Sequence, residues 1–234
     1  MRLLELSLIC LLLTGASLGS ENSGVKAEIN KLLPDWKIER LAVGDLNRDG
    51  KSDVAVILSQ TKKTKDKSEE ASEEKLVTLQ VFLRNSSTGK LTFKTDAPKA
   101  VCGGCGGVKE NFEISILKGV LILNFYSGAA AFDSQVITKW RLQNEDFDLI
   151  GVTVKESDIS RTDITAIERD ANITTLKMTE KVFKVVGQSD SETPKTKPTT
   201  MNCIVPATYK GHKLSSYSLE VEDSFPKCSK VELK

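Results

Sequence analysis

Residues 41 to 59 read LAVGDLNRDGKSDVAVILS, and this stretch has the pattern of two strands joined by a turn. Apolar residues precede and follow a segment, 45–53, that is rich in Asp, Asn and Gly. Residues of those three types favour turns, whereas alternating apolar and β-branched residues favour strands. We therefore predict a β-hairpin in which a strand that contains Trp36 and Ile38, and extends toward Leu41 and Val43, pairs with a strand at 53–59 across this loop.

Further short apolar runs extend this pattern along the chain. Turn signals such as Lys118-Gly119 and 144–146 separate them, which is typical of antiparallel strands joined by hairpins. The predicted fold is mainly β: an antiparallel sheet or curled meander, sandwich-like or partial-propeller-like. Its further strands are expected at 76–83, 90–94, 111–117, 120–126, 135–142, 147–154 and 181–186, with one or two more within 164–178.

One short helix is predicted on the N-terminal side of the hairpin. Val25, Ile29, Leu32 and Leu33 recur at helical spacing, and Pro34 ends the run. The predicted helix is short and amphipathic.

Polar segments divide the remainder of the chain. Residues 61–75 carry no apolar side chain larger than Ala71, so we expect a solvated loop between strands there. Residues 187–200 are polar and contain prolines, which predicts a linker. The β-rich domain is therefore expected to cover 21–186, and the weakly apolar tail 201–234 is expected to hold a shape only if it is tethered.

The first residues have the composition of a secretory signal peptide. Arg2 provides a weak positive charge, residues 8–13 form a short apolar core, and small residues follow at 15–20. The apolar run is shorter than the roughly 20 residues of a membrane span. We therefore predict a cleaved signal peptide at 1–20, a mature chain that begins at Glu21 and has no membrane span, and a periplasmic or secreted location.

Composition limits the classes of function. The length of 234 residues fits one domain, or one domain with an appendage. The net charge of +1 argues against a nucleic-acid-binding protein. His212 is the only histidine of the sequence. A single histidine excludes most zinc hydrolase designs, and it excludes a Ser-His-Asp triad placed elsewhere in the chain.

The segment 45–53 also has the spacing of a calcium-binding loop. Its sequence fits D-x-N-x-D-G-x-x-D, which directs oxygen ligands from alternate residues toward one point, and Gly50 permits the positive φ angle that the turn needs. Carboxylates held this close repel one another unless a cation compensates them. We therefore predict one Ca²⁺ ion bound by side-chain oxygens of Asp45, Asn47 and Asp49, by the main-chain carbonyl of Lys51, and by Asp53 directly or through water.

An EF-hand and a plain hairpin turn are the two other interpretations of this loop. The loop differs from an EF-hand, because Val56 stands at the twelfth position, where a bidentate Glu is required, and strands are expected on both sides. A plain hairpin turn is the alternative interpretation, since Asp, Asn and Gly favour turns in any case. An extracellular calcium site of this kind has a dissociation constant on the order of 0.1 to 1 mM, and magnesium suits it less because that ion keeps most of its water.

Residues 41–56 resemble an FG-GAP repeat, the calcium-binding unit of integrin α-chain propellers. More broadly, the chain is similar to small exported bacterial proteins of unknown function that carry one such unit near the N-terminus. This resemblance implies a calcium-binding β fold and no particular activity. The residues that carry it lie at 34–36 before the loop, in the glycine-cysteine segment 101–108, at 125–130, and in the pair 140–142 and 148–151.

Four cysteines follow the predicted signal peptide, and an even number in an exported protein favours disulfides. We favour Cys203 with Cys228, because this bond would close the tail into a loop and stabilise it by about 3 kcal/mol in the chain-entropy model. Cys102 would then pair with Cys105. Crossed pairings stay open, as do a redox-active Cys102–Cys105 pair and a four-cysteine zinc site.

These features predict an exported, non-enzymatic, calcium-binding β protein that serves as an interaction or structural module. Its expected partner is an unidentified protein or envelope component rather than nucleic acid. The alternative is a periplasmic enzyme, either a hydrolase or one with thiol–disulfide chemistry at Cys102 and Cys105.

Overall fold

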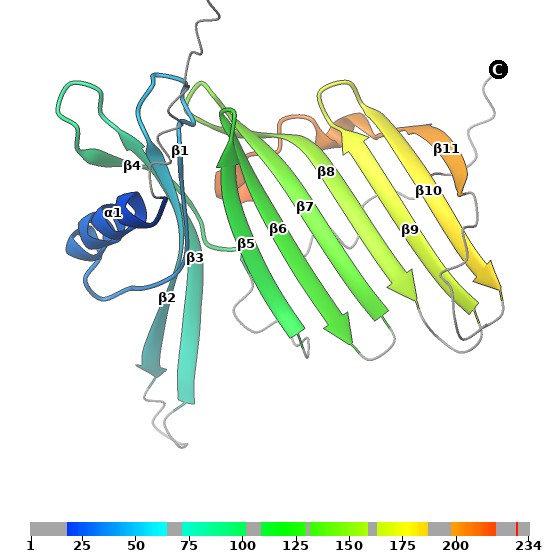
Figure 1. Ribbon diagram of the computed structural model, residues 1–234, viewed down its shortest axis with the longest axis horizontal. Coiled ribbons are helices and arrows are strands. Elements are labelled where there is room, and N and C mark those ends of the chain that lie inside the picture. The colour runs from blue at the N-terminus through cyan, green and yellow to red at the C-terminus, as the bar shows by residue number, and fades with distance from the viewer. Residues whose placement is uncertain are drawn as a thin grey trace, which may run out of the picture.

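The computed structural model describes residues 18–64, 72–101, 109–129, 132–158, 163–186, 198–218 and 228. The described part is mainly β, with strands arranged in two antiparallel sheets and with one α-helix near the N-terminus (Figure 1). The prediction of a mainly β, antiparallel fold with one short N-terminal helix is therefore confirmed.

The smaller sheet contains the predicted hairpin. Four antiparallel strands follow one another in the order β1-β2-β3-β4. In the hairpin, Gly44 faces Asp53 and Leu41 faces Val56 across the ladder. The strands are β1 (Lys37–Gly44), β2 (Asp53–Thr64), β3 (Ser72–Arg84) and β4 (Leu91–Ala97).

The larger sheet is a seven-stranded antiparallel meander whose neighbours in sequence are also neighbours in space. Lys118 and Gly119 both have positive φ angles, 53° and 76°, as a tight two-residue hairpin requires. The strands are β5 (Lys109–Leu117), β6 (Val120–Ala129), β7 (Phe132–Gln143), β8 (Asp146–Asp158), β9 (Asp163–Asn172), β10 (Lys177–Val186) and β11 (Thr199–Ile204).

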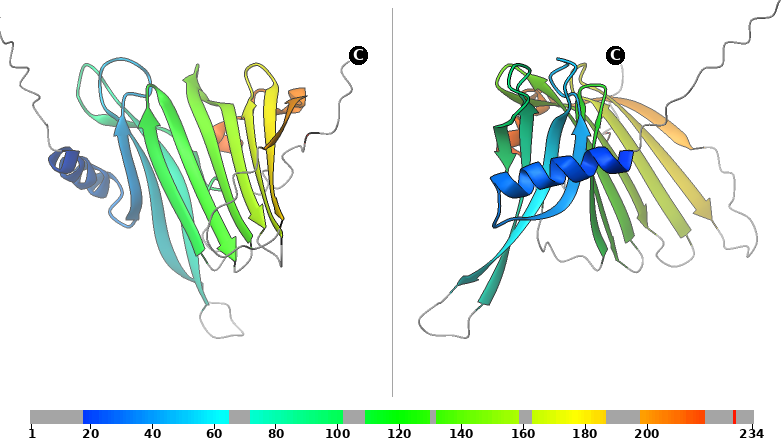
Figure 2. Two further views of the ribbon diagram at one scale, coloured as in Figure 1. Left: turned by 45° about the vertical axis from the view of Figure 1, so that its right-hand side comes forward. Right: turned by 60° about the vertical axis from the view of Figure 1, so that its left-hand side comes forward.

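Helix α1 (Leu18–Leu32) covers the face of the smaller sheet that points away from the larger one (Figures 1 and 2). Val25 and Ile29 are buried there in a cluster with Val54, Val56, Leu58, Phe82 and Leu91. The alternate β2 residues Ala55 and Ile57 belong to the second core, between the sheets. Burial on both faces explains why this strand is almost continuously apolar in sequence.

The second core fills the space between the two sheets. Trp140, Phe147 and Leu121 of the larger sheet are fully buried, and they share a cluster with Leu79 and Val81 of the smaller sheet. The indole Nε1 of Trp140 donates to Oγ1 of Thr138 at 2.8 Å, so its polar atom is satisfied within the core.

Strands β1 and β5 meet where the two sheets join. Arg40 donates from Nε to the carbonyl of Phe112 at 2.9 Å and from Nη2 to Oδ1 of Asn111 at 3.1 Å. Gly44 lies against Ile116 so closely that a Cβ atom would come within 2.7 Å of the isoleucine Cγ2. The absence of a side chain at Gly44 therefore permits this approach.

The polar segment 61–75 differs from the prediction of a solvated loop. Strand β2 continues to Thr64 and β3 begins at Ser72, and the register pairs Lys62 with Glu74. These residues carry no large apolar side chain, so hydrophobic patterning does not reveal this extension of the two strands. Residues 65–71 lie outside the described residues.

Residues assigned to the linker and the tail in the sequence extend the larger sheet and close the core. Strand β11 begins at Thr199 and pairs with β10, and the 3₁₀ helices η1 (Ala207–Tyr209) and η2 (Leu214–Ser216) follow it. Val205 and Leu214 are fully buried in the core between the sheets.

The same C-terminal segment is also held to the β7–β8 hairpin. The Leu149 amide donates to the His212 carbonyl at 3.0 Å, Lys213 forms an ion pair with Asp148, and the Tyr217 ring packs edge-on against Trp140. A few apolar residues are enough to hold this segment in place, because each of them packs into a core that the sheets already form. In residues 198–218, the packing therefore shows no boundary between the predicted domain and the predicted tail.

A substitution pair tests this packing. Leu214→Ala should lower the free energy of unfolding by about 2 to 5 kcal/mol, because a fully buried side chain leaves a cavity. Leu117→Ala, at a side chain that is 60% exposed, should change it by no more than about 0.5 kcal/mol. Urea unfolding followed by tryptophan fluorescence measures both, and equal effects would contradict the packing of η2.

Candidate metal site

The acidic loop, which we define as residues 45–53, connects β1 to β2 at one end of the smaller sheet (Figure 1). Arg48 and Gly50 have positive φ angles of 64° and 81°. The value at Gly50 agrees with the expectation from the sequence. Left-handed conformations at both positions fold the loop back on itself and bring side chains from alternate residues together.

Side-chain oxygens in the loop converge on its own backbone N–H groups. Asp45 accepts a hydrogen bond from the Asp49 amide at 3.1 Å and another from the Gly50 amide at 2.9 Å. Oδ1 of Asn47 accepts from the same Asp49 amide at 3.0 Å, and Oδ1 of Asp49 accepts from the Lys51 amide at 2.8 Å. The structure therefore brings together three of the four predicted side-chain ligands.

Asp53 has a different environment from these three side chains. It is fully buried, Oδ2 accepts from the amides of Leu46 at 2.8 Å and Asn47 at 3.3 Å, and Oδ1 accepts from the Arg84 amide at 2.8 Å. Burial raises the pKa of the Asp53 carboxyl above its ordinary value, and the three backbone hydrogen bonds oppose that shift. Both oxygens thus face backbone donors of the loop and of β3.

Asp49 also contacts the turn between β3 and β4. Its Oδ2 accepts from the Ser86 hydroxyl at 2.6 Å and from Nδ2 of Asn47 at 3.2 Å. The Ser86 hydrogen bond, followed by that of the Lys51 amide, lowers the pKa of Asp49 below its ordinary value. Asp49 is therefore ionised at neutral pH.

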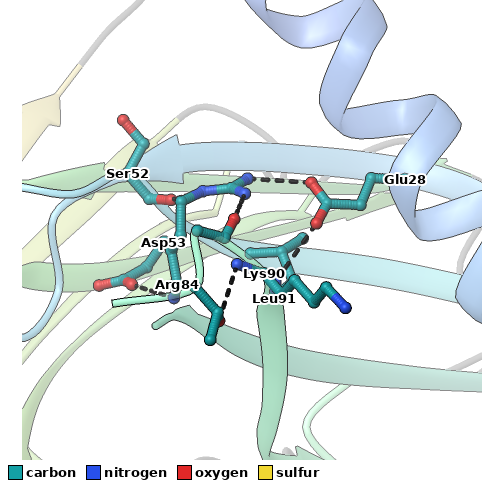
Figure 3. Close-up of polar contacts among 8 residues, drawn as sticks. Glu28, Ser52, Asp53, Arg84, Lys90 and Leu91 are labelled. Carbon is teal, nitrogen blue, oxygen red and sulfur yellow. Dashed lines mark hydrogen bonds and ion pairs between the residues drawn. The ribbon is translucent and has the colours of Figure 1, made fainter. Parts of the chain in front are cut away.

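Arg84 connects the acidic loop to helix α1 (Figure 3). Its guanidinium donates to the Ser52 carbonyl at 3.1 Å and to the Gly89 carbonyl at 2.6 Å, and it forms an ion pair with Glu28 at 3.1 Å. The other carboxylate oxygen of Glu28 accepts from the Leu91 amide at 3.3 Å. One guanidinium thus touches the loop, the β3–β4 turn and the helix.

Arg48 connects the acidic loop to the larger sheet. Its Nη2 donates to the Lys118 carbonyl at 3.4 Å, and its side chain lies so close to Gly119 that a Cβ there would come within 2.7 Å of Nε. The acidic loop therefore lies at a junction of both sheets.

The donor set fits a hard cation in part. Asp45, Asn47 and Asp49 present oxygens on one side of the loop, which is the chemistry that Ca²⁺ prefers. Within the described residues, no three Asp, Glu, His or Cys side chains are grouped closely enough to hold a metal by themselves. A site here would therefore depend on Asn47 and on main-chain oxygens such as the Lys51 carbonyl as well.

The two cysteines that the structure describes, Cys203 and Cys228, lie away from the acidic loop. The structure joins Cys203 of β11, an edge strand of the larger sheet, to Cys228, with Cα atoms 5.7 Å apart; this is the pairing favoured from the sequence. Cys102 and Cys105, with the redox and zinc hypotheses that depend on them, lie outside the described residues.

Sequence reasoning missed Arg84, Glu28 and Ser86, because each is distant in sequence from the loop it contacts. No local motif marks them. The one available signal is that β3 and its turn follow the hairpin directly, so that the end of β3 lies beside the loop.

Asp53→Asn should destabilise the protein by about 2 to 3 kcal/mol even when no calcium is present, because an amide NH₂ would face a buried backbone N–H. The matched control is Asp96→Asn, at an exposed position on β4, which should have little effect. Urea unfolding in a chelating buffer measures both. Equal stabilities of Asp53→Asn and wild type would contradict the structural role of this carboxylate.

In the described part of the chain, no helix has the length and apolar character of a membrane span. Comparisons with protein-family models, with curated proteins and with solved structures find no match to this chain.

Proposed function

We propose that the acidic loop binds one Ca²⁺ ion and that the chain is an exported, non-enzymatic module whose ion stabilises the junction of α1 and the two sheets. The observation that carries this proposal is the convergence of oxygens from Asp45, Asn47 and Asp49 on one turn of backbone. The resemblance of residues 41–56 to an FG-GAP repeat supports the same ion.

Electrostatics favours a cation at this position. Asp45 and Asp49 both accept from backbone groups within the same short turn, so their charges lie close together. Backbone N–H groups and the charge of Lys51 compensate these carboxylates in part, and a divalent ion would compensate them more completely. Calcium suits the set better than magnesium, because it accepts many protein oxygens in a flexible geometry.

The proposed ligands are the side chains of Asp45, Asn47 and Asp49 with the Lys51 carbonyl. Asp53 supports them by holding the amides of Leu46 and Asn47, and any bond it makes to the ion would use lone pairs that these amides leave. The bound ion would supply charge compensation, not a reaction step.

A structural role for the ion follows from where the loop lies. The loop contacts the β5–β6 turn through Arg48, the β3–β4 turn through Asp49, and α1 through Ser52 and Arg84. An ion that holds the loop in one conformation would therefore stabilise contacts of both sheets and the helix together. Surfaces formed by these turns are where we place the partner, an unidentified protein or envelope component.

Calcium should raise the melting temperature of the wild-type protein measured by circular dichroism. A ligand that binds only the folded state stabilises it by about 1.4 kcal/mol at a concentration roughly ten times its dissociation constant. Asp49→Ala and Asp49→Asn should lose most of this response, and magnesium at the same concentration should produce a smaller one.

The control is Asp96→Ala, which removes a carboxylate from an exposed position in β4 and should respond to calcium as the wild type does. If wild type and Asp49→Asn show the same melting temperatures with and without calcium, the proposed ion site is wrong.

Export is tested separately by N-terminal sequencing of the protein secreted by its native host. We expect a mature chain that begins near Glu21, from which the first helical residues are removed. Val25 and Ile29, which bury the helix against the smaller sheet, both follow this point, so α1 should remain docked. Recovery of a chain that still begins at Met1 would contradict a cleaved signal peptide.

A further inference from the structure

The Arg84 side chain contacts both the acidic loop and α1. From the end of β3, its guanidinium donates to the Ser52 carbonyl next to Asp53 and to the Gly89 carbonyl in the β3–β4 turn. Its remaining nitrogen forms the ion pair with Glu28 (Figure 3). The three contacts require one placement of the guanidinium, because its donors form a rigid planar fork.

Glu28 has an equally constrained position on the helix. One carboxylate oxygen pairs with Arg84 and the other accepts from the Leu91 amide at the start of β4. The side chains of Arg84 and Glu28 are only 19% and 33% exposed, so water screens the pair less than it screens a pair on the open surface. Glu28 lies between Val25 and Ile29 in sequence, so this pair forms only when the helix is docked.

The loop end of the same network is the proposed ion site. The Arg84 amide donates to Asp53, whose other oxygen holds the amides of Leu46 and Asn47. Displacement of Arg84 would therefore release the Ser52 carbonyl and disturb the backbone that positions the ligands. A loop stabilised by an ion would in turn hold the Ser52 carbonyl where Arg84 meets it.

We propose that Arg84 and Glu28 are positioning residues for the ion site, so that calcium binding to the acidic loop and docking of α1 stabilise each other. This inference rests on the proposed calcium binding and adds its regulation. By linkage, the factor by which a docked helix raises calcium affinity equals the factor by which calcium favours the docked helix. A partner that binds or displaces α1 would thereby change the calcium affinity of a loop that it does not touch.

The test compares Glu28→Gln with wild type in calcium titrations by isothermal calorimetry. Glu28→Gln removes the ion pair while it keeps an acceptor for the Leu91 amide, and it should weaken calcium binding about fivefold. Glu145→Gln is the matched control, because Glu145 is 97% exposed and pairs with Lys94 instead. This control should bind calcium as tightly as wild type, which separates the network from a general loss of negative charge.

Hydrogen exchange of the amides in residues 22–32 provides the second readout, which a merely structural ion pair would not move. Calcium should slow exchange of these helix amides in wild type and in Glu145→Gln, and it should do so less in Glu28→Gln. If Arg84→Gln folds, it should behave like Glu28→Gln. If Arg84→Gln does not fold, the comparison of Glu28→Gln with wild type alone tests the coupling.

The outcomes separate the two proposals. If wild type binds no calcium, the proposed ion site fails and the coupling fails with it. If wild type binds calcium with an affinity that Glu28→Gln leaves unchanged, and calcium does not alter exchange in α1, the ion site stands and the coupling is overturned.

Discussion

The buried carboxylate of Asp53 is the constraint on which the rest of this region depends. The fully buried carboxyl group is tolerated because three backbone amides from two separate segments donate to its oxygens. Two of these amides belong to the acidic loop and the third to the end of β3. The first residue of β2 therefore determines at once how the loop turns back and where the neighbouring strand ends.

The arrangement of layers follows from the double burial of β2. Val54, Val56 and Leu58 face α1, while Ala55 and Ile57 face the larger sheet. The helix thus covers a face of the smaller sheet that would otherwise expose its apolar residues. The same arrangement places Glu28 within reach of Arg84, so hydrophobic docking of the helix and the polar network at the loop require the same geometry.

The C-terminal segment that follows β10 contains few apolar residues, yet it adds a strand to the larger sheet and contributes to the core. Val205, Leu214 and Tyr217 are separated by polar residues, yet all three are buried in the core between the sheets. Backbone pairing of β11 with β10 and the disulfide from Cys203 to Cys228 hold this segment in place. Because the core is already largely formed by Trp140 and Phe147, a few additional apolar side chains are sufficient to seal it.

The local features of this protein could be predicted from its amino-acid sequence alone. Alternating apolar residues predicted most strands, Lys118-Gly119 predicted a hairpin turn, and the spacing of Asp45, Asn47 and Asp49 predicted side chains that converge. These are interactions between residues close in the chain, for which periodicity and turn preference are enough. The tertiary contacts, in contrast, direct Asp53 at backbone amides, place Ser86, Arg84 and Glu28 around the loop, and bring Val205, Leu214 and Tyr217 into the core. Those outcomes depend on which distant segments share a buried surface, and no local pattern encodes that choice.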